Sequence, residues 1–278
     1  MTDLKMGRCA IGSYPYDRYS TEYFLEAACA LGFDKIELWA AAPQIDLFSL
    51  TPSFCRALHQ KLKERGLFVC AVTPEQCNYP VNLAAEEASL RRRSLDFFKA
   101  GADLAAELES PWLLVSAGCG YYDHPVAPAR ECCLDSMGQL ALYAQERGVR
   151  LVFETLTPTS SNLVNTPFEV RQMIDALPSD TVYGMIDIGQ MTVMNQTVAD
   201  YGKALGKKLA HVHLHDTGDA CHMALGDGTL DLEAILNEIL ALGYQGLFSL
   251  ECNDPRYRSD PRGMDRRNAA WLKQHGWL

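Results

Sequence analysis

Four histidines stand in one short segment of the chain. Residues 211–228, HVHLHDTGDACHMALGDG, also hold three aspartates and three glycines. His211, His213 and His215 alternate, so on an extended strand their side chains would point to the same side. The segment suits a metal site, a polar surface tract or a strand with polar contacts. The choice depends on whether other strands end in residues that complete a coordination sphere.

Four consecutive apolar runs late in the chain end in, or close to, a residue able to bind a metal. They are LVFETL with Glu154, GMIDIGQ with Asp187, HVHLHD with His213 and FSLECN with Glu251. A single carboxylate at a strand end is ordinarily a helix cap or a solvated loop residue. Several carboxylates gathered in apolar surroundings are costly unless a cation neutralises them. The set therefore predicts one divalent cation. Its oxygen-rich donors suit manganese or magnesium, with cobalt and zinc left open.

The remaining polar residues near these strand ends have alternative interpretations. Glu37 in KIELW is a further inward candidate on an early strand. His211 would lie deeper than His213, and we expect it to be a hydrogen-bonded core histidine. His215 would lie near the rim, either solvated or in contact with a substrate. His222, in the loop CHMALGDG, is expected either to line a pocket or to lie on the loop surface.

These residues need strands that bring their ends to one place. Eight short, mostly apolar runs are typical of buried strands, and stretches with helical spacing separate them. The expected strands cover 9–14, 34–39, 67–73, 111–118, 149–156, 182–188, 209–216 and 246–253. The expected helices cover 20–31, 51–65, 86–109, 125–147, 166–177, 197–206, 231–242 and 260–274.

Alternating strands and helices predict a parallel sheet with right-handed crossovers. Eight units without a linker predict an α/β fold in which residues 1–278 form a single (β/α)8 TIM barrel. Its active site would lie at the carboxyl ends of the strands. A doubly wound open sheet is the alternative, but IGSYPYD, at the end of the first strand, lacks the G-x-G-x-x-G pattern. Thr51-Pro52 and Thr166-Pro167 predict helix N-caps, and glycines after several helices predict their ends.

Composition excludes several other classes of protein. The formal net charge of −10 disfavours non-specific binding to nucleic acid. A secretory signal would require an apolar run after the early Lys5 and Arg8, and the sequence has none there. No stretch approaches the roughly 18 apolar residues of a membrane span. The ten cysteines form no C-x-x-C pair, so we expect buried free thiols in a reducing cytoplasm.

The motifs of the chain resemble, in order and spacing, those of a known superfamily. They include GFDKIELWAAAP, TPEQCNYPVN, RRRSLDFFKAGADLA, LVSAGCGY, LTPTSSNLV, MIDIGQ, HVHLHD, GDGTLDL and GYQGLFSLE. Together they resemble the xylose-isomerase-like barrel superfamily, which includes sugar isomerases, sugar epimerases and endonuclease IV. Within it, the chain resembles the fructoselysine 3-epimerases and, more broadly, the ketose 3-epimerases.

The resemblance implies that Glu154, Asp187, His213 and Glu251 match the four metal ligands of the family, and that Glu154 and Glu251 are its acid–base pair. It implies inversion at C3 of a ketose or ketosamine. The cation, expected to be Mn²⁺, would bind the C2 carbonyl and C3 hydroxyl oxygens and stabilise a cis-enediolate. One glutamate would remove the C3 proton while the other delivers a proton to the opposite face. The expected partners are a small-molecule sugar, weakly favoured as unphosphorylated, and further copies of the chain in a homo-oligomer.

Four residues are expected to meet the substrate: Glu37, Trp39, Gln190 and His222. Glu37 could instead orient a metal ligand, and Trp39 could supply an apolar wall or barrel packing. The chain departs from its relatives at two places. Gln190 stands where several relatives have histidine, and the seventh loop has Ala220 where a D-x-H motif often begins.

Other functions remain open on the same fold. An aldose–ketose isomerase would move the proton of a different carbon, and an inosose-type isomerase or dehydratase also begins by enolisation beside a ketone. An endonuclease IV-like nuclease would need extra histidines on early strands, and none occurs near VTPEQ or LVSAGCGY. A non-catalytic barrel that binds sugars or partners would be expected to lack one or more of the four ligands.

Overall fold

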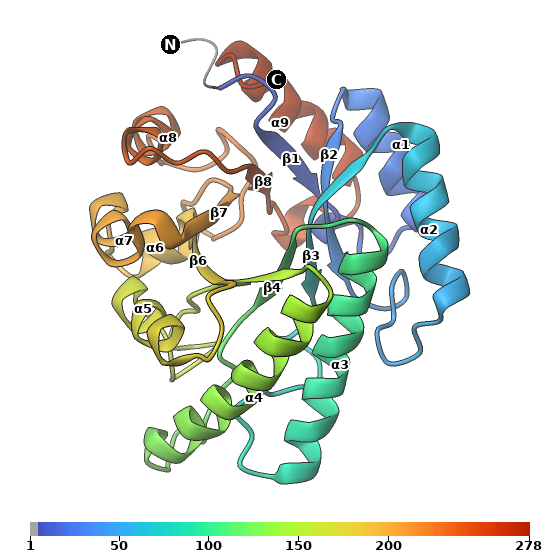
Figure 1. Cartoon of the computed structure of the whole chain (residues 1–278). Coiled ribbons are helices and arrows are strands. Elements are labelled where there is room, and N and C mark those ends of the chain that lie inside the picture. Colours follow the sequence, from blue (N-terminus) through green and yellow to red (C-terminus); the bar gives the residue numbers. More distant parts are fainter. Residues whose placement is uncertain (1–4) are drawn as a thin grey trace.

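The computed structural model describes residues 5–278, in which eight parallel strands close into a barrel (Figure 1). The strands follow one another in sequence order, and the ring closes where β1 pairs with β8. This closed (β/α)8 TIM barrel confirms the expected fold and excludes the open sheet. The strands are β1 (Cys9–Gly12), β2 (Lys35–Ala40), β3 (Phe68–Pro74), β4 (Trp112–Val115), β5 (Arg150–Phe153), β6 (Val182–Asp187), β7 (Leu209–Leu214) and β8 (Phe248–Leu250).

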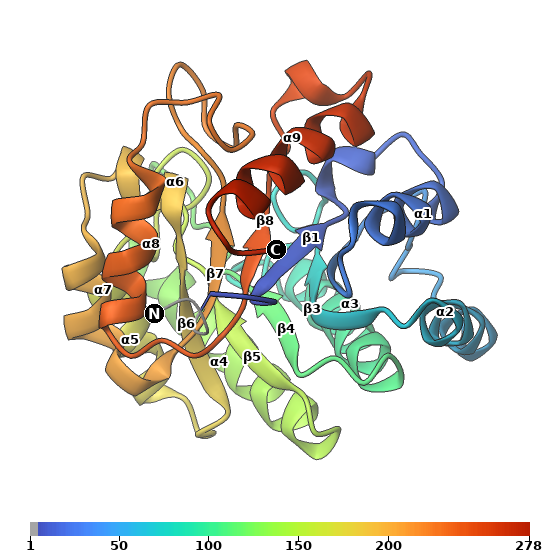
Figure 2. The same cartoon turned by 90° about the horizontal axis from the view of Figure 1, so that it is seen from above.

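Helices surround the barrel, and the last one lies beside β1 and α1 where the ring closes (Figures 1 and 2). All eight expected helices are present, with ends within two residues of the expected ones. The short helix α6, directly after β6, was not expected. The helices are α1 (Thr21–Leu31), α2 (Pro52–Arg65), α3 (Ala88–Glu107), α4 (Val126–Glu146), α5 (Pro167–Ala176), α6 (Ile188–Val193), α7 (Val198–Leu205), α8 (Leu232–Ala241) and α9 (Pro261–Gln274).

Capping residues set the helix boundaries as the sequence indicates. The Thr51 hydroxyl accepts the Phe54 N–H at the start of α2, and Thr166 forms a capping box with Glu169 at the start of α5. After α1, Gly32 has a φ of +89°, a left-handed conformation that glycine adopts without strain. The chain therefore turns sharply out of the helix towards the next strand.

The two-residue period of the strands separates the barrel interior from the layer beneath the helices. Phe153 packs in the large outer core, whereas Val152 and Met185 belong to a small cluster inside the barrel. Because side chains alternate along a strand, Glu154 and Asp187 continue the inward face begun by Val152 and Met185. These carboxylates lie near the barrel axis because of their positions along the strands, not because of their residue type alone.

The same alternation directs the inward residues of β7 and β8. Val212 and Leu214 pack in the outer core, which leaves His213 inside the barrel. On β8, Leu250 faces outwards, and Glu251 is the next inward position. Strand pairing places His213 level with Asp187 on β6.

The structure bears on membrane-spanning segments and on the state of the cysteines. Within residues 5–278, no helix is both long enough and apolar enough to cross a membrane. All ten cysteines are free thiols, as expected, but only half of them are buried.

Candidate active site

The four expected metal ligands meet at the carboxyl end of the barrel. Glu154, Asp187, His213 and Glu251 are all buried, and one donor atom from each lies within 4.8 Å of the others. The Nδ1 atom of His213 is at the centre of the group. It lies 3.2 Å from Glu154, 3.7 Å from Asp187 and 2.7 Å from Glu251.

Glu37 fixes the orientation of the His213 ring from the opposite side. Its Oε1 atom lies 3.0 Å from His213 Nε2, and its Oε2 atom lies 2.8 Å from His211 Nε2. Tyr14 and Thr73 donate their hydroxyls to the same carboxylate. Glu37 is fully buried and is not among the residues that line the cavity. Its position favours the role of orienting a ligand over contact with a substrate.

The geometry around His213 fits a divalent cation. With Nε2–H donating to Glu37, Nδ1 carries a lone pair towards three carboxylates. His213 Nδ1 and Glu251 Oε2 are buried, and neither has a hydrogen-bond partner among the described residues. Burial lowers the pKa of His213, but Tyr14 and the carboxylates of Glu251 and Glu37 raise it well above its usual range. The cluster therefore favours positive charge at its centre, where Glu154, Asp187, His213 and Glu251 would hold a cation.

The two glutamates of the cluster have different electrostatic surroundings. Burial raises the pKa of Glu154 to about 7, and His213 offsets part of this effect. Burial also acts to raise the pKa of Glu251, but the His213 and His222 rings hold it below its usual range. A cation among these groups would lower both pKa values, because positive charge favours ionised carboxylates.

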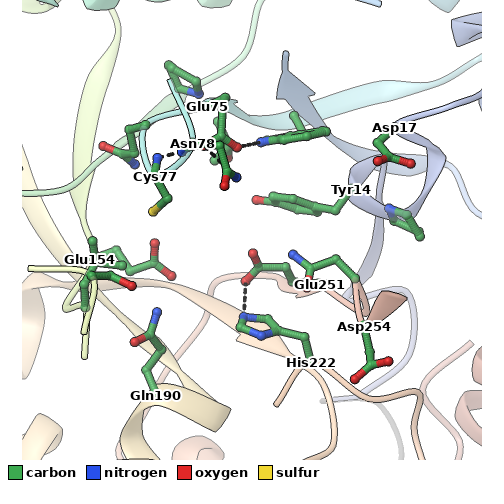
Figure 3. A pocket seen from close by; sticks show the side chains of 18 of the residues that line it. Tyr14, Asp17, Glu75, Cys77, Asn78, Glu154, Gln190, His222, Glu251 and Asp254 are labelled. Atoms are coloured by element: carbon green, nitrogen blue, oxygen red, sulfur yellow. Dashed lines mark hydrogen bonds and ion pairs between the residues drawn. The ribbon is translucent and has the colours of Figure 1, made fainter. Parts of the chain in front are cut away.

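A cavity of about 460 Å³ opens above the cluster. Figure 3 shows Glu154 and Glu251 reaching into it from different sides, with His222 and Gln190 below them in the view. Trp39, predicted to meet the substrate, also lines this cavity. The full lining comprises Tyr14, Pro15, Asp17, Trp39, Thr73, Pro74, Glu75, Gln76, Cys77, Asn78, Glu154, Leu156, Ser160, Gln190, His222, Glu251, Asn253, Asp254, Pro255 and Arg258.

A hydrogen bond holds Gln190 in the cavity wall, and an ion-pair contact holds His222 there. The Gln190 amide oxygen accepts the Thr157 N–H at 2.8 Å, which leaves its amide nitrogen free to donate towards the cavity. His222 Nε2 lies 3.6 Å from Glu251 Oε2 (Figure 3). Of the two interpretations of His222, the structure supports pocket lining.

Residues 25–275 match the family described as the xylose isomerase-like TIM barrel. The chain belongs to this family.

Several members are similar to the chain over most of their length. Fructoselysine 3-epimerase of Escherichia coli O157:H7 is 29% identical over 261 residues, covering 93% of this chain and 94% of that protein. D-psicose 3-epimerase of Enterocloster bolteae is 27% identical over 237 residues, covering 82% and 75%. The solved structure of D-psicose 3-epimerase from Clostridium cellulolyticum H10 has a TM-score of 0.81 at 18% identity, covering 97% and 99%, and shows the same fold.

The loop after β3 adds cavity residues that the sequence did not single out. Glu75 accepts the backbone N–H groups of Cys77 and Asn78 at 2.7 and 2.5 Å, and the Trp39 indole N–H at 3.0 Å. This turn places the Cys77 side chain in the cavity, with its sulfur towards Glu154 (Figure 3). Burial, with Glu154 and Glu75 nearby, raises the pKa of the Cys77 thiol to about 12. A carboxylate directly after a strand, in TPEQCN, was the available signal.

His211, on β7, is a buried, hydrogen-bonded core histidine, as expected.

The loop after β7 buries His215, which was expected near the rim, and Asp216, to which no role was assigned. His215 was expected near the rim but is fully buried, so it is not solvated. Asp216 organises this loop of the barrel, because its carboxylate accepts the N–H groups of Gly226 and Gly228 at 3.0 and 3.1 Å.

Proposed function

We propose that the protein is a divalent-metal-dependent sugar epimerase that inverts C3 of a ketose or ketosamine. One observation carries this proposal: Glu154 and Glu251 reach one cavity from β5 and β8, with His213 Nδ1 3.2 and 2.7 Å from them. Inversion requires one base and one acid on opposite faces of the same carbon. The names of the family members described above, all sugar 3-epimerases, support the same chemistry.

The residues divide into holding groups and proton-transfer groups. Asp187 and His213 hold the cation, and Glu37 keeps the His213 lone pair directed at it. Glu154 and Glu251 complete the ligand set, and each also carries a proton to or from the substrate carbon. A divalent cation, for which this oxygen-rich set suits Mn²⁺, would supply Lewis-acid stabilisation of negative charge on the substrate oxygens.

The cavity supports a small, unphosphorylated substrate. Its volume of about 460 Å³ lies within the range of small-molecule sites. Among its lining residues only Arg258 is a lysine or arginine, and its guanidinium pairs with Asp17 at 3.3 Å. A phosphate group would therefore find no unpaired lysine or arginine in this wall, whereas Gln190 and His222 offer donors to sugar hydroxyls.

Turnover in deuterated water tests the proposal. Metal-loaded protein should convert a ketose or ketosamine to its C3 epimer, with solvent deuterium at C3. Glu154→Gln and Glu251→Gln should each stop turnover, because the amide keeps the shape of the side chain and removes its basicity. Metal content must be measured in the same variants, since lost metal would mimic a lost base. Asp265→Asn is the matched control, because Asp265 is a buried carboxylate that does not line the cavity.

Two results would overturn the assignment. Efficient turnover by either glutamine variant would remove that glutamate from the proton-transfer pair. Deuterium that appears at C1 or C2 instead of C3 would make the protein an aldose–ketose isomerase.

A further inference from the structure

His215 is a fully buried residue that the proposed chemistry does not use. It follows β7 directly and does not line the cavity. Its Nε2 atom lies 3.1 and 3.2 Å from the two carboxylate oxygens of Asp187. Either nitrogen of a neutral imidazole can carry the hydrogen, and the choice determines whether His215 donates to Asp187.

The backbone of the β7 loop determines the tautomer of His215. The N–H of His222 points at His215 Nδ1, with an N···N distance of 3.1 Å. Nδ1 must then accept, and Nε2 carries the hydrogen that is donated to Asp187. The other tautomer would donate from Nδ1 to the Asp216 carbonyl at 3.2 Å. It would place two hydrogens against each other at Nδ1 and two lone pairs against each other at Nε2.

His215 Nε2 lies almost equally close to the two oxygens of Asp187, whose other neighbours differ. Oδ1 accepts the N–H of Gln190 at 2.6 Å, as the N-cap of α6. Oδ2 faces the ligand group, 3.7 Å from His213 Nδ1. The His215 hydrogen is thus shared by both oxygens, while the Gln190 N–H occupies Oδ1 and leaves Oδ2 directed at the cation position.

Close packing against Gly189 and His222 holds the His215 ring. A Cβ atom added at Gly189 would lie 2.1 Å from His215 Cε1, so the first turn of α6 leaves room for the ring only because residue 189 is glycine. The His222 ring stacks on it, with centroids 4.3 Å apart and an interplanar angle of 22°. The nearly parallel rings cannot both aim at one ion, which argues for His215 as a donor to Asp187 rather than a second metal site.

We infer that His215 is a positioning residue: the His222 backbone fixes its tautomer, and its Nε2–H fixes the Asp187 carboxylate with Oδ2 facing the metal position. The inference rests on the metal site of the proposed function. Groups of this kind, hydrogen-bonded to a metal ligand, orient that ligand and raise metal affinity.

Two polar substitutions separate the two hydrogen bonds of His215. In His215→Asn the amide oxygen lies near the former Nδ1 and accepts the His222 N–H, but nothing reaches Asp187. In His215→Gln the amide nitrogen reaches the former Nε2 position and donates to Asp187. Both variants lose the ring, so they share its packing cost. Calorimetric titration with Mn²⁺ should give a Kd for His215→Asn about 10- to 100-fold weaker than wild type, and His215→Gln should recover most of that loss.

Controls separate this role from simple loosening of the loop. Tyr257→Phe removes the hydroxyl that accepts the Ala224 N–H at 3.1 Å, in the same loop, without touching His215. It should leave the Mn²⁺ affinity unchanged. Gly189→Ala should weaken Mn²⁺ binding by displacing the ring, and it serves as the test if neither His215 variant folds.

Three results would contradict the positioning role, and a fourth would instead overturn the metal site. Equal Mn²⁺ affinity in His215→Asn and His215→Gln, or weakening by Tyr257→Phe as large as by His215→Asn, would overturn the positioning role. Wild-type affinity in Gly189→Ala would also contradict it. Failure of the wild-type protein to bind Mn²⁺ at all would instead overturn the metal site on which the proposed function rests.

Discussion

Glu37 Oε1 lies 3.0 Å from His213 Nε2, on the side of the imidazole ring remote from the three candidate carboxylate ligands. Both side chains are almost wholly buried, so water does not compete for this contact. The contact decides which nitrogen of His213 faces the cavity, and it ties a residue of β2 to a ligand set supplied by β5 to β8.

Glu37→Gln should weaken Mn²⁺ binding by about 10-fold or more, because the neutral amide no longer stabilises the tautomer with Nδ1 free to bind metal. Calorimetric titration measures the affinity. Thr73→Val is the matched control, since it removes one hydroxyl donor to the same carboxylate and leaves the contact with His213 in place. An unchanged Kd in Glu37→Gln would show that the ring needs no support from β2.

Asp187→Ala should abolish stoichiometric metal binding, because it removes a buried ligand and the N-cap of α6 together. Metal analysis of the purified variant, after dialysis against trace Mn²⁺, checks this expectation. Glu75→Gln changes another buried carboxylate of the cavity and should retain the ion. Full occupancy with retained activity in Asp187→Ala would remove this residue from the ligand set.

Metal-loaded protein should not incise duplex DNA at abasic sites. The cavity mouth carries Asp17 and Asp254, and its single arginine, Arg258, is already paired with Asp17. Such a surface repels a phosphate backbone. Gel analysis of a labelled abasic duplex tests the expectation. Incision that requires metal and disappears in Glu251→Gln would place the protein in the nuclease branch of its family.

Asp265 should make the protein less stable as pH rises from about 4 to about 7. Burial raises the pKa of its carboxyl to about 7, although Tyr16 and Asn268 donate to it. Between these pH values the unfolded chain releases the proton and the folded chain keeps it, so protonation favours the folded state below pH 4 and this stabilisation is lost by pH 7. The full shift corresponds to roughly 4 kcal/mol.

Urea unfolding of wild type and Asp265→Asn at pH 4.5 and 7.5, with chelator present, tests this. Because both proteins share the other titrating groups, the difference between them isolates Asp265. The unfolding free energy of the variant should rise relative to that of wild type at the higher pH. A pH-independent difference would contradict the prediction.

The barrel and its inward carboxylates were predictable because one local rule governs both. Hydrophobic alternation assigns Val152 to the interior, and the same period carries Glu154 there two residues later. Helix ends were equally accessible, since threonine–proline and glycine signals act over a single turn.

The environment of His215 was not predictable in this way. Its burial follows from the fold of the β7 loop and from the space at Gly189, on a different element, and neither contact has a sequence period. The turn built on Glu75 likewise depends on Trp39 of β2. Contacts between loops and distant strands depend on tertiary packing, so they form only once the barrel has closed and cannot be predicted from the sequence of either element alone.

The carboxylate of Asp216 has a consequence for binding kinetics. Besides the two glycine amides it accepts the N–H groups of Thr217 and Leu230 at 2.8 and 3.2 Å, so the loop folds around one of its own side chains. The conformational entropy of ordering this segment is thus lost when the chain folds, not when a ligand arrives. An incoming sugar meets a preorganised wall, and its association rate should depend on diffusion and dehydration rather than on closure of this loop.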